Sequence, residues 1–166
     1  MVCSFTGHRK IVKAHEGKIG ELVARAVEYA YNEGCRLFQS GGAIGFDLLA
    51  AREVLKFKIL HPDAKLNMVL PCIDQTRGWS ASQIDAYEYV LRCADTVEYV
   101  SEEYTADCMK KRNLRLAETC DILIAYVGYD RSGSAQTLRF AQKMEKRVYN
   151  LYPTLQKETG NPADLG

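Results

Sequence analysis

Six short apolar runs alternate with segments of helical periodicity along almost the whole chain, and this alternation limits the folds that the sequence can adopt. Strands that are joined through helices within one sheet run parallel and need helices on both faces. The pattern therefore predicts an α/β fold, with a doubly wound, mainly parallel sheet of about six strands. The predicted strands span residues 2–6, 36–39, 66–70, 96–100, 122–127 and 147–151, and the predicted helices span residues 19–30, 48–60, 82–93, 105–119 and 135–144.

The length of the chain fits one domain. A chain of 166 residues with 47% hydrophobic content can bury one full core and is too short for two ordinary domains. We assign residues 1–152 to this single domain. Residues 153–166 hold little apolar content, and we expect them to form a loosely ordered C-terminal tail.

Composition restricts the class of function. Twenty-two Lys and Arg against 21 Asp and Glu give a net charge of +1, so no overall field points to nucleic acid or to an anionic membrane. The sequence has neither a membrane-spanning apolar stretch nor the pattern of a signal peptide. Six cysteines without a C-x-x-C pair favour a reducing compartment. We therefore expect a cytoplasmic protein with no membrane partner.

Neither a metal site nor a cofactor is predicted. His8, His15 and His61 are the three histidines, and their positions lack the spacing of metal ligands.

The predicted fold gathers four loops at one edge of the sheet. Ligands of doubly wound sheets bind beyond the carboxyl ends of the strands, where the direction of the connections reverses. The loops expected at these ends are residues 6–9, 40–45, 71–79 and 127–134.

The loop of residues 40–45, Ser-Gly-Gly-Ala-Ile-Gly, is the strongest functional signal among them. Gly41, Gly42 and Gly45 can adopt positive φ and let a ligand approach the backbone. Free N–H groups at the start of the following helix attract an anion or a phosphate. The loop matches neither the G-x-G-x-x-G fingerprint nor a P-loop, and a tight turn without a ligand is the alternative.

Charged residues flank this loop. Asp47 falls in the first turn of the predicted helix, where it either caps free N–H groups or accepts hydrogen bonds from ribose hydroxyls. Arg9 follows Thr6, Gly7 and His8 at the end of the first strand. Its guanidinium can hold a phosphate in a fork, or it can pair with a nearby carboxylate.

The remaining candidates lie in three other segments. Gln75 can read the edge of a base on which Trp79 stacks, although Trp79 can equally hold its loop against the next helix. Arg112 and Asn113 either turn toward the ligand or belong to a solvated helix face. The turn of residues 132–134, Ser-Gly-Ser, offers hydroxyls and N–H groups at a helix start, or a simple N-cap.

Taken together, these motifs resemble the YpsA-like family of the SLOG superfamily, whose distant relatives include DprA/Smf and the LOG enzymes. The resemblance covers residues 1–152 and implies a Rossmann-like fold whose glycine loop binds a nucleotide or a nucleotide-derived ligand. The motifs that carry it are C-S-F-T-G-H-R from Cys3, G-G-A-I-G-F-D from Gly41 with Ala50 and Ala51, L-P-C from Leu70 with Gln75 and Trp79, Arg112 with Asn113, and Ser132-Gly133-Ser134.

Two departures qualify what the resemblance implies. LOG enzymes carry a P-G-G-x-G-T-x-x-E pattern, whereas this chain has Ser40 for the proline, Phe46 for the threonine and Leu49 at the position of the glutamate. The difference argues against LOG-type hydrolysis. The last loop of the family is usually a glycine pair followed by threonine, in place of residues 132–134 here.

We predict a binding protein for a nucleotide or nucleotide derivative, acting as a ligand sensor or regulatory module, because no activated nucleophile or acid–base pair is evident. Two alternatives stay open, and enzymatic activity with them. One is a LOG-like nucleotide N-glycosidic hydrolase with Asp47 or Glu53 as its carboxylate; the other is single-stranded DNA binding, as in DprA.

The expected partner is a small nucleotide or another phosphate-bearing molecule. Nucleic acid is less favoured, and a homodimer is compatible with the sequence. The predicted ligand-binding residues are Thr6, Gly7, His8, Arg9, Ser40, Gly41, Gly42, Ala43, Gly45, Asp47, Gln75, Trp79, Arg112, Asn113, Ser132, Gly133 and Ser134.

Overall fold

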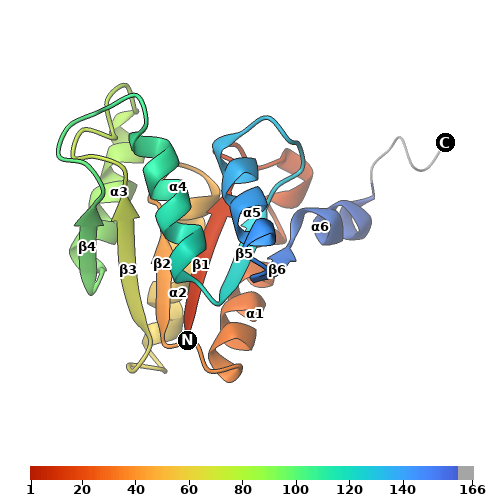
Figure 1. The fold of residues 1–166 in the computed structure, drawn as a ribbon. Helices are drawn as coiled ribbons and strands as arrows, with labels where there is room; N and C mark the ends of the chain where they lie inside the picture. Colours follow the sequence, from red (N-terminus) through yellow and green to blue (C-terminus); the bar gives the residue numbers. More distant parts are fainter. Residues whose placement is uncertain (161–166) are drawn as a thin grey trace.

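The computed structural model of the chain describes residues 1–160, which form six strands and six α-helices in almost strict alternation (Figure 1). In chain order the elements are β1 (Val2–Gly7), the 3-10 turn η1 (Lys13–His15), α1 (Ile19–Asn32), β2 (Leu37–Ser40), α2 (Phe46–Lys58), β3 (Lys65–Leu70), α3 (Ala81–Cys93), β4 (Thr96–Tyr99), α4 (Cys108–Thr119), β5 (Ile122–Tyr126), α5 (Gly133–Lys143), β6 (Arg147–Asn150) and α6 (Tyr152–Thr159).

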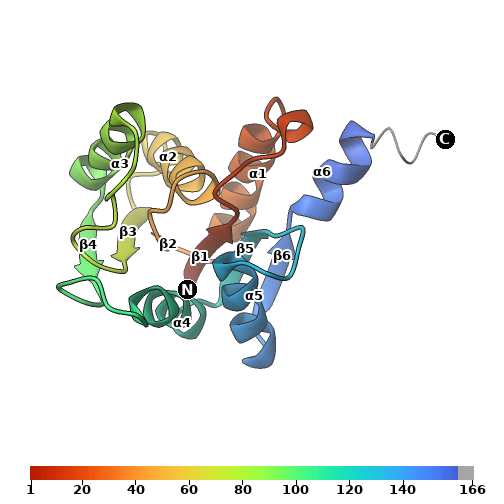
Figure 2. The same ribbon diagram turned by 90° about the horizontal axis from the view of Figure 1, so that it is seen from above.

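The six strands form one parallel sheet in the order β4-β3-β2-β1-β5-β6. From β1 the chain steps outward through β2 and β3 to β4, and then returns to the other side of β1 to begin β5. Because right-handed connections change face when the direction reverses, α1, α2 and α3 cover one face and α4 and α5 the other (Figure 2). The predicted doubly wound α/β fold is confirmed.

The main apolar core lies between the sheet and α1, α2 and α3. Val27 and Val54 recur on the inner faces of α1 and α2, and they meet Phe5, Phe38 and Leu66 of the sheet, all without solvent exposure. Helical spacing of apolar residues therefore produced the buried faces that the sequence pattern indicated. No helix among residues 1–160 combines the length and apolar character needed to cross a bilayer.

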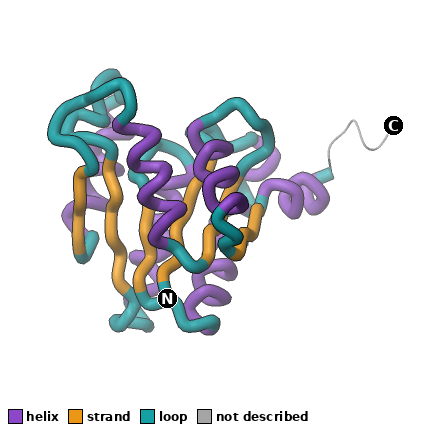
Figure 3. The backbone as a smooth tube through the Cα atoms, in the orientation of Figure 1, coloured by secondary structure: helices purple, strands orange, loops and turns teal. Residues whose placement is uncertain are grey.

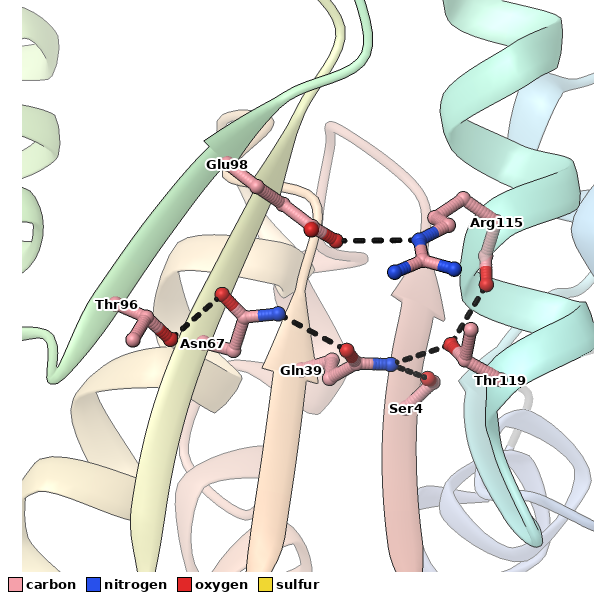
Figure 4. Close-up of polar contacts among 7 residues, drawn as sticks. All are labelled: Ser4, Gln39, Asn67, Thr96, Glu98, Arg115 and Thr119. Carbon is pink, nitrogen blue, oxygen red and sulfur yellow. Dashed lines mark hydrogen bonds and ion pairs between the residues drawn. The ribbon is translucent and has the colours of Figure 1, made fainter.

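The opposite face of the sheet carries a row of polar side chains beneath α4 (Figure 4). Thr96 donates to Asn67 over 2.8 Å, and Asn67 donates to Gln39 over 3.0 Å. Gln39 then donates to Ser4 over 3.2 Å and to Thr119, at the end of α4, over 2.7 Å. Because buried amides need fixed partners, this row sets the position of α4 over the sheet.

The loops that leave the carboxyl ends of the strands gather at one edge of the sheet (Figure 3). This is the edge at which sequence reasoning expected the ligand. The direction of the connections reverses between β1 and β5, which pair directly along residues 3–7 and 122–126.

The expectation of a loosely ordered tail from residue 153 is wrong for the part that the structure describes. Pro153 lies in the first turn of α6, where its fixed φ suits a helix start. Leu155 is fully buried in the main core, and Gln156 bonds the buried His15 over 2.9 Å. Leu155 is the buried anchor of this helix and half-buried Tyr152 also packs against the core, a pattern too weak to predict a helix from the sequence. Residues 161–166 of the predicted tail lie outside the described residues.

Truncating this anchor should cost considerable stability. Leu155→Ala is expected to lower the free energy of unfolding by about 2–4 kcal/mol, because it leaves a cavity in a closed core. Leu60→Ala is the matched control, because Leu60 is 83% exposed and its truncation should change the stability by less than about 0.5 kcal/mol. Urea unfolding of both variants checks this, and equal effects would show that α6 is not part of the core.

Candidate functional site

A cavity of about 450 Å³ opens at the carboxyl ends of β1 and β5, where the direction of the connections reverses. Loops after three strands and the helices α2, α4 and α5 contribute to its wall. The lining residues are Thr6, Gly7, His8, Arg9, Lys10, Ala43, Asp47, Met109, Arg112, Asn113, Leu116, Tyr129, Ser132, Gly133 and Ser134. We call this the switch-point cavity.

Asp47 brings the only carboxylate that residues 1–160 contribute to the wall of this cavity. Its side chain comes from the first turn of α2 and is 95% buried, since only 5% is exposed. One oxygen, Oδ2, accepts from the Ala43 N–H over 3.4 Å, while Oδ1 has no hydrogen-bond partner among the described residues. Burial raises the pKa of Asp47 to about 6, although the positive charge of Arg112 and the nearby N–H groups of Ala43 and Gly7 act against the rise. The unpartnered oxygen is available to a donor in the cavity.

Arg112 ties α4 to the glycine loop. Its guanidinium donates to the Gly41 carbonyl over 2.6 Å and to Asn113 Oδ1 over 2.9 Å. Asn113 in turn donates to the Gly133 carbonyl at the start of α5 over 3.1 Å. Burial lowers the pKa of Arg112 and the negative charge of Asp47 opposes this shift. Sequence reasoning left open whether these two residues face solvent; both are buried and line the cavity.

His8 has a positioning role. Its Nε2 accepts from the Gly128 N–H over 2.8 Å, so the proton of the neutral ring lies on Nδ1, 3.1 Å from Ser134 Oγ. Burial lowers the pKa of His8, which favours this neutral form. The ring stacks on Tyr129 with centroids 3.9 Å apart and planes at 3°. His8 therefore holds the loop between β5 and α5 against the end of β1.

The start of α5 points backbone donors at the cavity. Ser132 is the N-cap, and its hydroxyl accepts from the Ala135 N–H over 3.1 Å. The N–H groups of Gly133 and Ser134 form no hydrogen bond with any residue from 1 to 160. Free donors at a helix start, together with the helix dipole, favour an anion at this point.

Besides Arg112, two more cationic side chains border the same cavity. Arg9 and Lys10 follow β1 directly, and neither side chain forms a hydrogen bond or an ion pair with the described part of the chain. Lys10 was not among the predicted residues, although it stands next to Arg9 in the sequence. Tyr129, Met109 and Leu116 were also missed, because apolar and aromatic side chains in a loop or helix carry no separate signal of a ligand.

Most of the glycine loop supports the cavity from behind. Gly42 and Gly45 have the predicted positive φ, +71° and +83°. A Cβ at Gly42 would come 2.7 Å from the Leu70 side chain, and one at Gly45 would come 2.2 Å from the Arg9 carbonyl oxygen. The close neighbour of these glycines is thus the protein itself. Ala43 alone of residues 40–45 lines the switch-point cavity, since Ser40, Gly41, Gly42 and Gly45 do not.

Three other predicted residues lie outside this cavity. Gln75 and Trp79 line a neighbouring cavity that shares Arg9 and Met109 with the first. Glu53, the second carboxylate considered for hydrolysis, faces a third cavity, which is bordered by α1, α2 and α3 and shares Arg9 with the switch-point cavity, and it pairs with Lys56 over 3.0 Å. Glu53 therefore does not line the switch-point cavity together with Asp47.

The arrangement suits a ligand with a negatively charged end and hydroxyl groups. Arg9, Lys10 and the free backbone N–H groups at the start of α5 supply positive charge and donors. The buried Oδ1 of Asp47 can accept a hydrogen bond from a ligand. Within residues 1–160 no group of three or more His, Cys, Asp and Glu side chains is placed to hold a metal ion.

The family follows from a comparison with known families. The model of the family YpsA, described as the YspA SLOG family, matches residues 9–156. The chain belongs to the YspA SLOG family. The match includes the Asp47 turn, Arg112 with Asn113, and the start of α5, and it confirms the resemblance noted in the sequence.

Two curated relatives of this chain come from Bacillus species. A UPF0398 protein of Bacillus thuringiensis (strain Al Hakam) and one of Bacillus cereus (strain Q1) are each 27% identical over 113 residues, which cover 67% of this chain and 61% of the relative. The matched region thus spans about 61% of the length of these relatives.

Two solved structures share the fold of this YspA SLOG chain. DNA processing protein A from Helicobacter pylori, studied for its single-stranded DNA binding mode, superposes with a TM-score of 0.65 at 16% identity, covering 97% of this chain and 74% of that one. DprA from Streptococcus pneumoniae gives a TM-score of 0.62 at 18% identity, covering 95% and 53%. These likenesses concern the fold.

Proposed function

We propose that this member of the YspA SLOG family binds a nucleotide or nucleotide derivative in the switch-point cavity and acts as a ligand sensor in the cytoplasm. The observation that carries the proposal is the unpartnered Oδ1 of Asp47, 95% buried in a cavity that also holds free cations and helix N–H groups. A volume of about 450 Å³ lies within the range of small-molecule sites.

The phosphate lies at the start of α5 in this proposal. The N–H groups of Gly133 and Ser134, the Ser134 hydroxyl, and the side chains of Arg9 and Lys10 supply donors and positive charge there. Backbone donors and a helix dipole bind a phosphate without a dedicated motif.

Asp47 accepts the ribose hydroxyls. A carboxylate can accept two hydroxyl donors, and donation to the charged form lowers its pKa. Because the pKa of Asp47 is raised to about 6 without a ligand, binding near pH 6 should release a proton.

Glycosidic hydrolysis is less well supported. Among residues 1–160, Asp47 is the only carboxylate on the wall of the switch-point cavity; Glu53 faces another cavity and Asp74 lines the cavity beside Gln75. The binding experiment described below also tests for an N-glycosidic hydrolase of the LOG type, because such an enzyme would release free base from the nucleotide.

Single-stranded DNA is the second candidate ligand, favoured by the fold that this chain shares with the DNA processing protein of Helicobacter pylori. The two proposals differ in salt dependence. DNA binding through several phosphates weakens steeply with salt, because each neutralised phosphate releases counterions, whereas one mononucleotide should show little of that dependence.

Thermal unfolding against a ligand panel tests the proposal. The panel comprises nucleoside monophosphates, dinucleotides, ADP-ribose and a short single-stranded DNA, each followed by chromatography of the products. A nucleotide at about 100 times its Kd should add about 2.7 kcal/mol of stability. Stabilisation by the DNA alone, with a steep dependence on salt, would replace our proposal by the second candidate.

Removing one cation should weaken binding without harming the fold. Arg9→Met is expected to lower nucleotide affinity about ten- to a hundredfold, because a charge-assisted hydrogen bond to phosphate contributes about 1.5–3 kcal/mol. Its melting temperature without ligand should stay unchanged, since the Arg9 side chain pairs with no described residue. Arg92→Met, at an exposed position on α3, makes the same charge change and serves as the control for calorimetric titration. Equal affinities of both variants would rule out a phosphate beside Arg9.

A further inference from the structure

A second cavity adjoins the switch-point cavity. Its volume is about 310 Å³, and Arg9 and Met109 line both cavities, so one ligand can extend from the first into the second. The other lining residues are Asp74, Gln75, Arg77 and Trp79 from the loop between β3 and α3, and Tyr104 from the loop between β4 and α4. We call it the Gln75 cavity.

Gln75 is the unusual residue of this cavity. Its side chain is only 7% exposed, and neither its amide nitrogen nor its amide oxygen has a hydrogen-bond partner within residues 1–160. The buried Tyr87 hydroxyl next to it also lacks a partner. Burial raises the pKa of Tyr87 to about 12, and neighbouring Gln75 acts in the opposite direction. The amide thus lies close to this hydroxyl but outside hydrogen-bonding geometry.

Unpaired buried amides are rare because leaving them unpaired costs stability. The buried side-chain polar atoms without a partner in the described chain belong to Asp47, Gln75 and Tyr87. Asp47 lines the first cavity and Gln75 the second. Two of these three residues therefore border adjoining cavities that share Arg9 and Met109, as expected when one ligand completes their hydrogen bonds, whereas Tyr87 lines neither cavity.

Aromatic side chains accompany the amide. Trp79 contacts Tyr87 at an angle of 83° with centroids 5.4 Å apart, and Tyr104, 63% exposed, stands on the wall. An amide offers one donor and one acceptor side by side, which is the pattern that bases present along their edges. Aromatic rings stack on any base. Together these groups match a flat heterocycle with adjacent donor and acceptor atoms.

We propose that the Gln75 cavity binds the purine or pyrimidine base of the nucleotide whose phosphate and ribose occupy the switch-point cavity. This inference rests on the proposed function. Gln75 reads the edge of the base, and Arg9 lies between the base and the phosphate. The ligand is then a base-bearing nucleotide, as opposed to a sugar phosphate or a small anion.

The test compares ligands with and without a base. The wild type, Gln75→Met and the control Gln142→Met are titrated with the four common nucleoside monophosphates and with ribose 5-phosphate. Methionine keeps the size of Gln75 and removes both polar atoms. Gln142 is exposed on α5, so its variant makes the same change away from both cavities. The single tryptophan makes fluorescence a reporter of the Gln75 cavity.

We expect the wild type to bind at least one nucleoside monophosphate about tenfold more tightly than ribose 5-phosphate, with a change in Trp79 fluorescence that ribose 5-phosphate does not cause. Gln75→Met should lose this preference, keep its affinity for ribose 5-phosphate within about twofold, and melt no lower than the wild type. Gln142→Met should behave as the wild type.

Two results would overturn the inference while the proposed function stands. In one, ribose 5-phosphate binds as tightly as every nucleotide, so the base contributes nothing. In the other, the preference for a base persists in Gln75→Met, so the base lies elsewhere. If no phosphorylated ribose binds, the proposed function fails and this inference fails with it.

Discussion

Asp47→Asn is expected to make the protein more stable at pH 7 and at the same time to weaken nucleotide binding at least about tenfold. The carboxyl has a pKa of about 6 in the folded chain against an ordinary value of 3.8, because burial disfavours its charged form. Ionising it at neutral pH therefore costs the folded state about 3 kcal/mol, which asparagine avoids.

The stability gained by Asp47→Asn should depend on pH. Between about pH 4 and pH 6 the folded chain holds a proton on Asp47 that the unfolded chain has released, so this group lowers the stability progressively as the pH rises through that window. The stability difference between Asp47→Asn and the wild type should be near zero at pH 4 and reach its full value above pH 6. Urea unfolding at several pH values measures it.

Asp85→Asn is the matched control for this series, because Asp85 is exposed on α3. Its stability difference from the wild type should stay flat across the same range. If Asp47→Asn is also flat, or is less stable than the wild type at pH 7, Asp47 is an ordinary structural residue and the argument from its vacant oxygen is lost.

Gly45→Ala is expected to destabilise the protein by about 3 kcal/mol or more. Gly45 has a φ of +83°, and a Cβ there would lie 2.2 Å from the Arg9 carbonyl oxygen and 2.7 Å from the His8 carbonyl oxygen. These are backbone atoms, which cannot swing aside. The loop after β1 would have to move, and the hydrogen bond from the Phe46 N–H to the His8 carbonyl would break.

Gly78→Ala separates the backbone strain from the contact. Gly78 has the same φ of +83°, yet nothing lies within 4 Å of a Cβ built there. Its cost should be that of the left-handed conformation alone, about 1 kcal/mol. Comparing the two variants by chemical unfolding isolates the contact with Arg9, and similar losses would mean that the two loops are not in close contact.

The fold could be predicted because alternation and chirality leave few arrangements. Each strand from Val2–Gly7 to Arg147–Asn150 was visible as a short apolar run, and the helices between them showed helical spacing. The helix Tyr152–Thr159 could not be predicted because Leu155 is its one fully buried residue and Tyr152 is half-buried, too few apolar positions to show helical periodicity.

The site was partly predictable for a related reason. A parallel sheet brings the carboxyl ends of its strands together, so Arg9, Asp47 and Ser134, distant in the sequence, could be assigned to one edge. The sequence could not predict whether the open side of each glycine, where other residues carry a Cβ, faces the ligand or the protein, because this depends on which atoms pack against it. Gly42 and Gly45 therefore face the protein, and the division of the edge into two cavities, with Gln75 in the second, needed the structure.

Amide chemical shifts of isotopically labelled protein, titrated with the nucleotide that stabilises it most, test whether the switch-point cavity holds the phosphate and ribose of a nucleotide. We expect the largest changes on Gly133 and Ser134, on residues 7–10 and on Asp47. Saturable changes confined to the cavity bordered by Glu53, or spread over the surface without saturation, would contradict it.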